Sequence, residues 1–107
     1  MNFKISIIVP CYNEQDSVPI FYNEITRVLS DLKCDYEICF INDGSTDGIL
    51  DILRQISDKN KNANYISFSR NFGKEAAMYA GFCNANGDYV CVMDADMQDP
   101  PGIFYLI

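Results

Sequence analysis

The sequence predicts an α/β fold: a Rossmann-like parallel sheet of strand order 3-2-1-4 with helices on both faces. Short apolar segments rich in β-branched residues alternate with segments whose apolar residues recur every three or four positions. The strand-like segments are nearly continuous in apolar character, which is typical of strands covered on both faces. Strands that are separated by helices pair in parallel through right-handed crossovers, so the pattern favours this sheet over an antiparallel one.

The first predicted strand is Lys4–Pro10, a short run rich in β-branched residues. A helix follows, because apolar side chains from Val18 to Leu32 recur at the spacing of one helix face. Either Asp16 or Ser17 is expected to be the N-cap of this helix, since both are residue types that favour that position.

The second predicted strand is Tyr36–Asn42, which ends at a turn-forming Asp-Gly-Ser sequence. The helix after it carries apolar residues at helical spacing from Ile49 to Ile56. Ser45 or Thr46 is expected to cap this helix, because a hydroxyl side chain accepts hydrogen bonds from unpaired amides of the first turn.

The remaining elements repeat the alternation. A polar loop is expected at Asn60–Asn64, a third strand at Tyr65–Ser69 and a helix at Lys74–Asn84. The turn signal Asn86–Asp88 then leads into a fourth strand, Tyr89–Met93, which is apolar throughout.

Composition restricts the class of protein. The 107 residues suit one domain, and a hydrophobic content of 49% excludes disorder as the main state. Acidic residues outnumber Lys and Arg by 15 to 8, which gives a net charge of −7 and argues against a nucleic-acid partner. The sequence holds no His, so imidazole catalysis and His-ligated zinc are excluded.

Neither a membrane span nor a disulfide framework is expected. No segment approaches the about 20 apolar residues that cross a bilayer, and the first residues do not resemble a signal peptide, so we expect a cytoplasmic location. The five cysteines show no metal-binding spacing and are expected to be free thiols, with Cys39 and Cys91 buried. A helix begins after Pro100-Pro101 without a stop signal, so we expect a longer parent protein. The oligomeric state is left open.

Polar residues gather at one edge of the predicted sheet. Each strand is followed by a polar cluster, and the opposite edge is expected to carry only solvated turn residues. In an open parallel sheet, ligands bind beyond the carboxyl ends of the strands, where the strand order reverses. The four clusters that meet at this edge are Pro10–Glu14, Asn42–Asp47, Ser69–Lys74 and Asp94–Asp99.

The cluster after the fourth strand predicts a metal site. Asp94, Asp96 and Gln98 are spaced by two residues, so in extended chain their side chains leave from one side. Two carboxylates and an amide oxygen suit Mg²⁺ or Mn²⁺, with water or phosphate completing the shell. The same spacing also occurs in ordinary acidic loops. Repulsion among Asp43, Asp94 and Asp96 nevertheless makes a cation physically expected.

Four further residues carry a functional and a structural interpretation. Asp43 either begins a turn or accepts a hydrogen bond from a ligand N–H group, such as that of a pyrimidine base. Asp47 either stabilises a helix N-terminus or contacts the ligand. Tyr12 either packs or offers a ring on which a base stacks, and Glu14 either caps a helix or accepts from a ribose hydroxyl.

Two cations lie near this edge. Arg70 and Lys74 can neutralise a diphosphate, or they can be solvated residues before a helix. A cation at a helix N-terminus is opposed by the helix dipole, so Lys74 needs another explanation. Neither the GxGxxG dinucleotide fingerprint nor a Walker phosphate loop is present.

Taken together, the motifs resemble the family 2 glycosyltransferases with the GT-A fold. Within that family, the chain is similar to the polyprenyl-phosphate branch, which includes dolichol-phosphate mannosyltransferases and bacterial undecaprenyl-phosphate transferases. Four motifs in matching order carry the resemblance: Ile7–Glu14, Asn42–Asp47, Ser69–Glu75 and Asp94–Pro101.

The resemblance implies an inverting, metal-dependent transfer of a hexosyl group from a UDP- or GDP-sugar to a lipid phosphate. It makes residues 1–107 the nucleotide-sugar-binding part of a glycosyltransferase domain, truncated at its C-terminal end, within a protein at the cytoplasmic face of the membrane. Position by position, it implies a nucleoside pocket, a ribose and phosphate contact, and a catalytic pair that also binds Mn²⁺ or Mg²⁺. These are Pro10, Tyr12, Glu14 and Asp43 for the nucleoside, Asn71 and Lys74 for ribose and phosphates, Asp94 for donor or metal, and Asp96 and Gln98 for metal.

Other classes remain as alternatives. A non-catalytic nucleotide-binding module, or an inactive fragment of such an enzyme, binds nucleotide without transferring a sugar. A phosphotransfer receiver domain needs an acidic pair after the first strand and an Asp after the third, and the sequence has neither. A nucleotidyltransferase normally shows a Gly-rich basic loop after the first strand, which is also missing.

Overall fold

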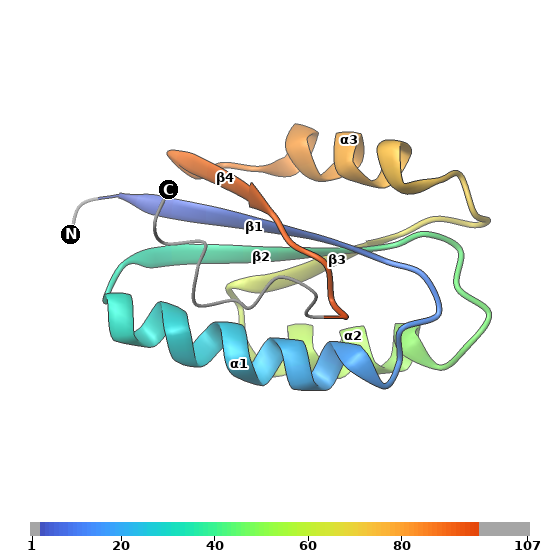
Figure 1. Ribbon diagram of the computed structural model, residues 1–107, viewed down its shortest axis with the longest axis horizontal. Helices are drawn as coiled ribbons and strands as arrows, with labels where there is room; N and C mark the ends of the chain where they lie inside the picture. Colours follow the sequence, from blue (N-terminus) through green and yellow to red (C-terminus); the bar gives the residue numbers. More distant parts are fainter. Residues whose placement is uncertain (1–2, 97–107) are drawn as a thin grey trace.

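The computed structural model describes residues 3–96 and shows the alternation of strands and helices that the sequence predicts. Its four strands pair in parallel in the order β3-β2-β1-β4, which confirms the predicted sheet (Figure 1). The elements follow one another as β1 (Lys4–Cys11), α1 (Ser17–Leu32), β2 (Asp35–Asn42), α2 (Ile49–Lys59), β3 (Ala63–Ser67), α3 (Lys74–Asn84) and β4 (Tyr89–Val92).

Helices lie on both faces of the sheet. Helices α1 and α2 lie against one face and α3 against the other (Figure 1). Strand β1 shows why two cores form, because successive side chains of a strand point to opposite faces. Ile7 and Val9 pack in the larger core with α1 and α2, whereas Ile8 packs in the smaller core beneath α3. All three side chains are fully buried.

Helix α1 buries one apolar stripe against the sheet. Phe21 on this stripe meets Phe40 of β2 edge to face, with ring centroids 6.4 Å apart, a favoured geometry for an aromatic pair. Asp16 occupies the N-cap position as predicted, but its side chain makes no cap hydrogen bond. The backbone carbonyl of Glu14 instead accepts from the amides of Ser17 and Val18, at 3.1 and 3.0 Å.

Helix α3 approaches the sheet closely through Gly81. A Cβ atom at this position would lie 2.4 Å from Cγ2 of Ile8 and 3.1 Å from Cδ1 of Ile41. Only a residue without a side chain allows this approach, because both isoleucines are fully buried and packed. Helix α3 is thereby held closely against β1 and β2.

Three predicted features of the strands and caps are wrong. Strand β3 is Ala63–Ser67, two residues earlier than expected. The buried Ala63 pairs with Ile38, so the end of the predicted polar loop belongs to the strand. Neither Ser45 nor Thr46 caps α2, whose N-cap position is Gly48. Strand β4 is not covered on both faces, since Tyr89 and Val90 at this end of the sheet are 58% and 40% exposed.

The opposite edge of the sheet also differs from the expectation of solvated turns alone. There the buried Glu37 carboxylate accepts from the Ser6 hydroxyl and from the Asn86 amide, and Lys4 pairs with it at 3.5 Å. The Gly87 amide donates to the Ser6 hydroxyl at 2.8 Å. Burial raises the pKa of Glu37, but these hydrogen bonds and the Lys4 charge together outweigh it and lower that pKa below its usual range. The network fastens the start of β4 to β1 and β2.

The cysteine prediction is confirmed for bonding and only partly for burial. All five cysteines are free, and Cys39 is buried, but Cys91 is only half-buried. Among residues 3–96, no helix is long and apolar enough to cross a membrane.

Candidate functional site

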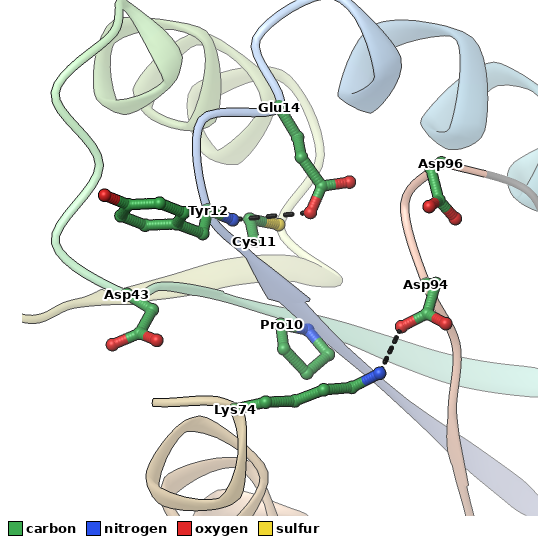
Figure 2. Close-up of a pocket in the computed structure, with 8 residues that line it drawn as sticks. All are labelled: Pro10, Cys11, Tyr12, Glu14, Asp43, Lys74, Asp94 and Asp96. Carbon is green, nitrogen blue, oxygen red and sulfur yellow. Dashed lines mark hydrogen bonds and ion pairs between the residues drawn. The ribbon is translucent and has the colours of Figure 1, made fainter. Parts of the chain in front are cut away.

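A cavity of about 280 Å³ opens beyond the carboxyl ends of β1, β2 and β4, where the sequence predicts a ligand site. Strand β1 lies between β2 and β4, so the strand order reverses at this point, as in other ligand-binding parallel sheets. Its lining comes from the ends of three strands and the first residue of α3. The lining residues are Pro10, Cys11, Tyr12, Glu14, Asp43, Lys74, Asp94 and Asp96 (Figure 2).

The cavity has two chemically different sides. Figure 2 shows the Tyr12 ring and Asp43 on one side, with the Glu14, Asp94 and Asp96 carboxylates and the Lys74 ammonium on the other. The Tyr12 side chain is 47% exposed, so its ring is available to a ligand. An aromatic surface at one side and charged groups at the other suit a ligand with a planar base and an anionic tail.

Two loops hold each other at the rim of the cavity. The Asn13 amide donates to the Ser45 hydroxyl at 2.9 Å, and the Asn13 side-chain oxygen accepts from the Thr46 amide at 2.8 Å. The Gln15 amide donates to Asp47 at 3.0 Å, and the Gln15 side chain accepts from the Gly48 amide at 2.7 Å. This reciprocal brace fixes the backbone that carries Tyr12 and Glu14.

The brace explains why the predicted caps of α2 are wrong. The Ser45 hydroxyl and Thr46 bind Asn13, while Asp47 accepts from the Ile49 amide at 3.1 Å and so serves the first turn of α2 itself. Asp47 does not line the cavity. Its structural interpretation therefore has direct support from these contacts.

Asp43 is buried, with 4% of its surface exposed, and its carboxylate binds the loop before α3. Its oxygens accept from the Phe72 amide at 2.8 Å, from the Gly73 amide at 3.1 Å and from the Asn71 side chain at 3.3 Å. Gly44 permits this close approach, because its φ is +69° and a Cβ there would lie 2.1 Å from the carbonyl carbon of Arg70. Asp43 thus ties the end of β2 to the start of α3.

Glu14 contributes a half-buried carboxylate to the cavity. One carboxylate oxygen accepts from the Tyr12 amide at 3.3 Å, and the other is buried without a hydrogen-bond partner among residues 3–96. Burial raises the pKa of Glu14, and the nearby charges of Asp96 and Asp94 raise it further against the opposing Tyr12 amide and Lys74. When Glu14 is ionised, one of its two oxygens therefore lacks a hydrogen-bond donor among residues 3–96.

Lys74 and Asp94 form an ion pair across the cavity. The Lys74 ammonium lies 2.9 Å from a carboxylate oxygen of Asp94 (Figure 2). This contact supplies the explanation that Lys74 needs at a helix N-terminus, where the dipole opposes a cation. The hydrogen bond to Asp94 and its charge raise the pKa of Lys74, with smaller contributions from Asp96 and Glu14.

The metal-site prediction assumes that the segment after β4 is extended, but the structure shows that it is not extended throughout. Ala95 and Asp96 lie in a turn, and Gln98 lies outside the described residues. Within residues 3–96, no three His, Cys, Asp or Glu side chains are placed to hold a metal ion by themselves. The oxygen donors of Asp94 and Asp96 nevertheless fit a Mg²⁺ or Mn²⁺ ion that takes its other ligands from phosphate and water. The partnerless Glu14 oxygen beside them adds an unmet demand for positive charge.

Most of the predicted site residues meet in the cavity. Asn71 does not line it and instead contacts Asp43, while Arg70 lies over the Phe72 ring at 4.6 Å from its centroid. Cys11 was not predicted, although it follows Pro10 directly at the end of β1. Burial, and next the Glu14 charge, raise the pKa of the Cys11 thiol well above its usual range, which disfavours the thiolate form at neutral pH.

Comparison with known proteins identifies the family. Residues 6–106 match the model of glycosyl transferase family 2. The chain belongs to glycosyltransferase family 2. The resemblance carried by the four sequence motifs is thereby confirmed.

Individual relatives of this family 2 glycosyltransferase chain agree in sequence and fold. The prophage bactoprenol glucosyl transferase homolog of Escherichia coli is 44% identical over 98 residues, which are 91% of this chain and 32% of that protein. The mannosyltransferase PcManGT of Pyrobaculum calidifontis, solved with GDP-Man and Mn²⁺, superposes with a TM-score of 0.78 at 22% identity, covering 90% of this chain and 28% of that one. TarS 1–349 of S. aureus, solved with UDP, gives a TM-score of 0.66 at 26% identity, covering 87% and 27%.

These structural neighbours confirm the GT-A fold for the described residues. The chain spans about a third of the length of the curated relatives that it matches.

Proposed function

We propose that this chain is the nucleotide-sugar-binding part of an inverting glycosyltransferase that moves a hexosyl group from a UDP- or GDP-sugar to a polyprenyl phosphate. The observation that carries the proposal is the two-sided cavity, in which an exposed Tyr12 ring lies opposite Lys74 and two aspartates. The bactoprenol glucosyl transferase name of the Escherichia coli relative supports a lipid-phosphate acceptor. The GDP-Man and UDP bound by the structural neighbours support a nucleoside diphosphate donor.

The nucleoside is assigned to the part of the cavity lined by Pro10, Tyr12 and Asp43, together with Glu14, whose carboxylate faces the charged side. Tyr12 offers a stacking surface, and Glu14 offers a carboxylate to a ribose hydroxyl. Asp43 already accepts from three N–H groups of the loop before α3. A carboxylate has about four lone-pair sites, so Asp43 keeps capacity for one further donor, such as the N–H of a base.

The diphosphate is assigned to the charged side of the cavity. Lys74 supplies an ammonium, and Asn71, which the resemblance assigns to ribose and phosphates, belongs to the loop before α3 that Asp43 holds. Asp94 and Asp96 would hold a Mn²⁺ or Mg²⁺ ion, with Gln98 as a further ligand from the segment that follows. When bound, the ion stabilises the negative charge that develops on the leaving nucleoside diphosphate.

The acceptor needs little activation from the protein. A lipid phosphate is already an anion at neutral pH, so no general base is required to make it a nucleophile. The task of the described residues is therefore to bind and orient the donor and to balance the charge of its leaving group. Contacts with the acceptor are assigned to the part of the longer relatives that lies outside the matched region.

Calorimetric titration of the chain with UDP, GDP and ADP, each with and without Mn²⁺, tests the donor assignment. Metal-dependent binding of UDP or GDP, and weaker binding of ADP, supports the proposal and names the base. In a full-length relative of this chain, we expect Asp96→Ala to abolish transfer. Wild-type turnover by that variant at saturating metal would rule out the metal assignment.

A non-catalytic nucleotide-binding module is the second candidate. It predicts the same calorimetric binding, but no sugar transfer by the chain or by a full-length protein that contains it. A transfer assay with radiolabelled UDP-glucose and undecaprenyl phosphate separates the two candidates.

A further inference from the structure

The ion pair between Lys74 and Asp94 joins a helix start to the end of an edge strand. Lys74 is the first residue of α3, and Asp94 lies two residues beyond the end of β4. Their charged groups are 2.9 Å apart, although the Lys74 side chain is 58% exposed and that of Asp94 is 32% exposed. A partly exposed pair of this kind contributes little to folding and exchanges partners readily. The pair therefore affects ligand binding in the cavity more than it affects the stability of the fold.

The charges that line the cavity are unbalanced without Lys74. Four carboxylates line it, and Lys74 is the single Lys or Arg among the lining residues that the structure describes. The Asp43 carboxylate is compensated by amides of the loop before α3. The charges of Glu14, Asp94 and Asp96 all act on Lys74, and one buried oxygen of Glu14 has no hydrogen-bond partner among the described residues. Lys74 is thus the described lining cation on which the charges of these three carboxylates act.

We propose that Lys74 is a place-holder for the divalent cation at Asp94, and that it leaves Asp94 for the diphosphate when metal and nucleotide enter together. This inference rests on the proposed function. It assigns two roles to one ammonium: blocking Asp94 against free metal, and binding phosphate once Asp94 is occupied by metal.

The physical basis of the blocking role is competition between cations. A divalent ion at Asp94 must displace the ammonium or bind beside it, and binding beside it is opposed by like-charge repulsion at short range. The diphosphate removes this cost, because it offers Lys74 a new anionic partner. Metal and nucleotide then raise each other's affinity by the same factor, as thermodynamic linkage requires.

The place-holder role predicts opposite effects of one substitution on two affinities. We expect Lys74→Met to bind Mn²⁺ about tenfold more tightly than the wild-type chain when no nucleotide is present, because both the competitor and its repulsion are gone. With Mn²⁺ saturating, we expect the same variant to bind UDP or GDP about tenfold more weakly, because one phosphate contact is lost. Electron paramagnetic resonance of free Mn²⁺ measures the first affinity and calorimetry the second.

Two variants control for charge and for size. Lys61→Met removes the same charge from an exposed position outside the cavity, and its Mn²⁺ affinity should match that of the wild type. Lys74→Arg keeps the charge at Asp94, so free Mn²⁺ should remain as weakly bound as in the wild type. Circular dichroism verifies that each variant is folded. We expect all of them to fold, because Lys61 and Lys74 are both exposed.

The outcomes separate this inference from the proposed function. If the wild-type chain binds a Mn²⁺–nucleotide complex but Lys74→Met does not gain affinity for free Mn²⁺, the place-holder role is overturned and the proposed function stands. Equal gains in Lys74→Met and Lys61→Met would also overturn it, since net charge alone would explain them. If the wild-type chain binds neither UDP nor GDP with Mn²⁺, both proposals fail.

Discussion

Replacing Asp43 with alanine tests how the loop before α3 is held in place. The change removes the acceptor of three N–H groups, at 2.8 Å from the Phe72 amide, 3.1 Å from the Gly73 amide and 3.3 Å from the Asn71 side chain. Asp43 itself is 4% exposed, and its carboxylate is the acceptor that holds this loop at the end of β2. The loop should therefore detach from the end of β2.

The magnitude follows from the two shorter bonds. A hydrogen bond to a charged group contributes about 1.5 to 3 kcal/mol, so two bonds give an upper value of roughly 3 to 6 kcal/mol. The donors of Asn71 and Phe72 are on exposed residues, so water recovers part of this energy. Removing a buried carboxylate also relieves its desolvation cost. We expect Asp43→Ala to lower the free energy of unfolding by about 2 kcal/mol.

Urea unfolding and amide hydrogen exchange together measure this effect. A loss of about 2 kcal/mol shifts the urea midpoint of a domain of this size by roughly 1 M or more. Asp58→Ala is the matched control, because Asp58 is an exposed carboxylate on α2, and its effect should stay within about 0.5 kcal/mol. Exchange of the Phe72 and Gly73 amides should accelerate in Asp43→Ala more than the global stability loss explains. Equal urea midpoints for the two variants, with both amides still protected from exchange, would show that Asp43 does not hold the loop before α3.

Further predictions concern pH and packing. Burial raises the pKa of Glu14, so the folded state loses stability as the pH rises and Glu14 ionises. At pH 7, Glu14→Gln should therefore unfold at a higher urea concentration than wild type. This difference should vanish below about pH 4, where Glu14 is protonated in both the folded and the unfolded state. The pKa of Glu37 is lowered on balance, so its contribution to folding stability is complete above about pH 4.3 and is lost as the pH falls through its folded-state pKa. In urea titrations, the stability difference between wild type and Glu37→Gln should therefore shrink in acid. A stability difference that does not depend on pH would contradict the Glu37 network. Gly81→Val should destabilise by about 2 kcal/mol in thermal unfolding because of the 2.4 Å approach to Ile8, and a neutral result would show that α3 shifts freely.

The sheet could be predicted from the sequence because its signals are local. The apolar alternation that gives β1 and β2 also gives their order and their position between helices. The position of β3 could not be predicted, because Ala63 carries no strand signal of its own and enters the sheet only through its pairing with Ile38. The exposure of Tyr89 is a property of where β4 lies in the sheet, which its apolar sequence does not contain.

The site could be predicted in outline but not in its internal contacts. Sequence reasoning brings Tyr12, Glu14 and Asp94 to one edge, because each follows a strand of a parallel sheet. It cannot distinguish a ligand-binding polar residue from one that braces a loop, because both types follow the same strands. Asn13 is an example, since only the three-dimensional pairing with Ser45 reveals its role. Lys74 is a partial exception, because its unfavourable place at a helix N-terminus is visible in the sequence and calls for an explanation, although only the structure identifies Asp94 as its partner.

Nuclear magnetic resonance of the ¹⁵N-labelled chain, titrated with Mg²⁺ and the nucleotide that calorimetry selects, shows where the nucleotide binds. We expect saturable shifts of the amides of Tyr12, Asp43, Lys74 and Asp94, with little change in the separate groove between α1 and α2 that includes Tyr22 and Ile56. Shifts confined to that groove, or no saturable shift from either UDP or GDP, would contradict the assignment of the nucleotide to the carboxyl ends of β1, β2 and β4.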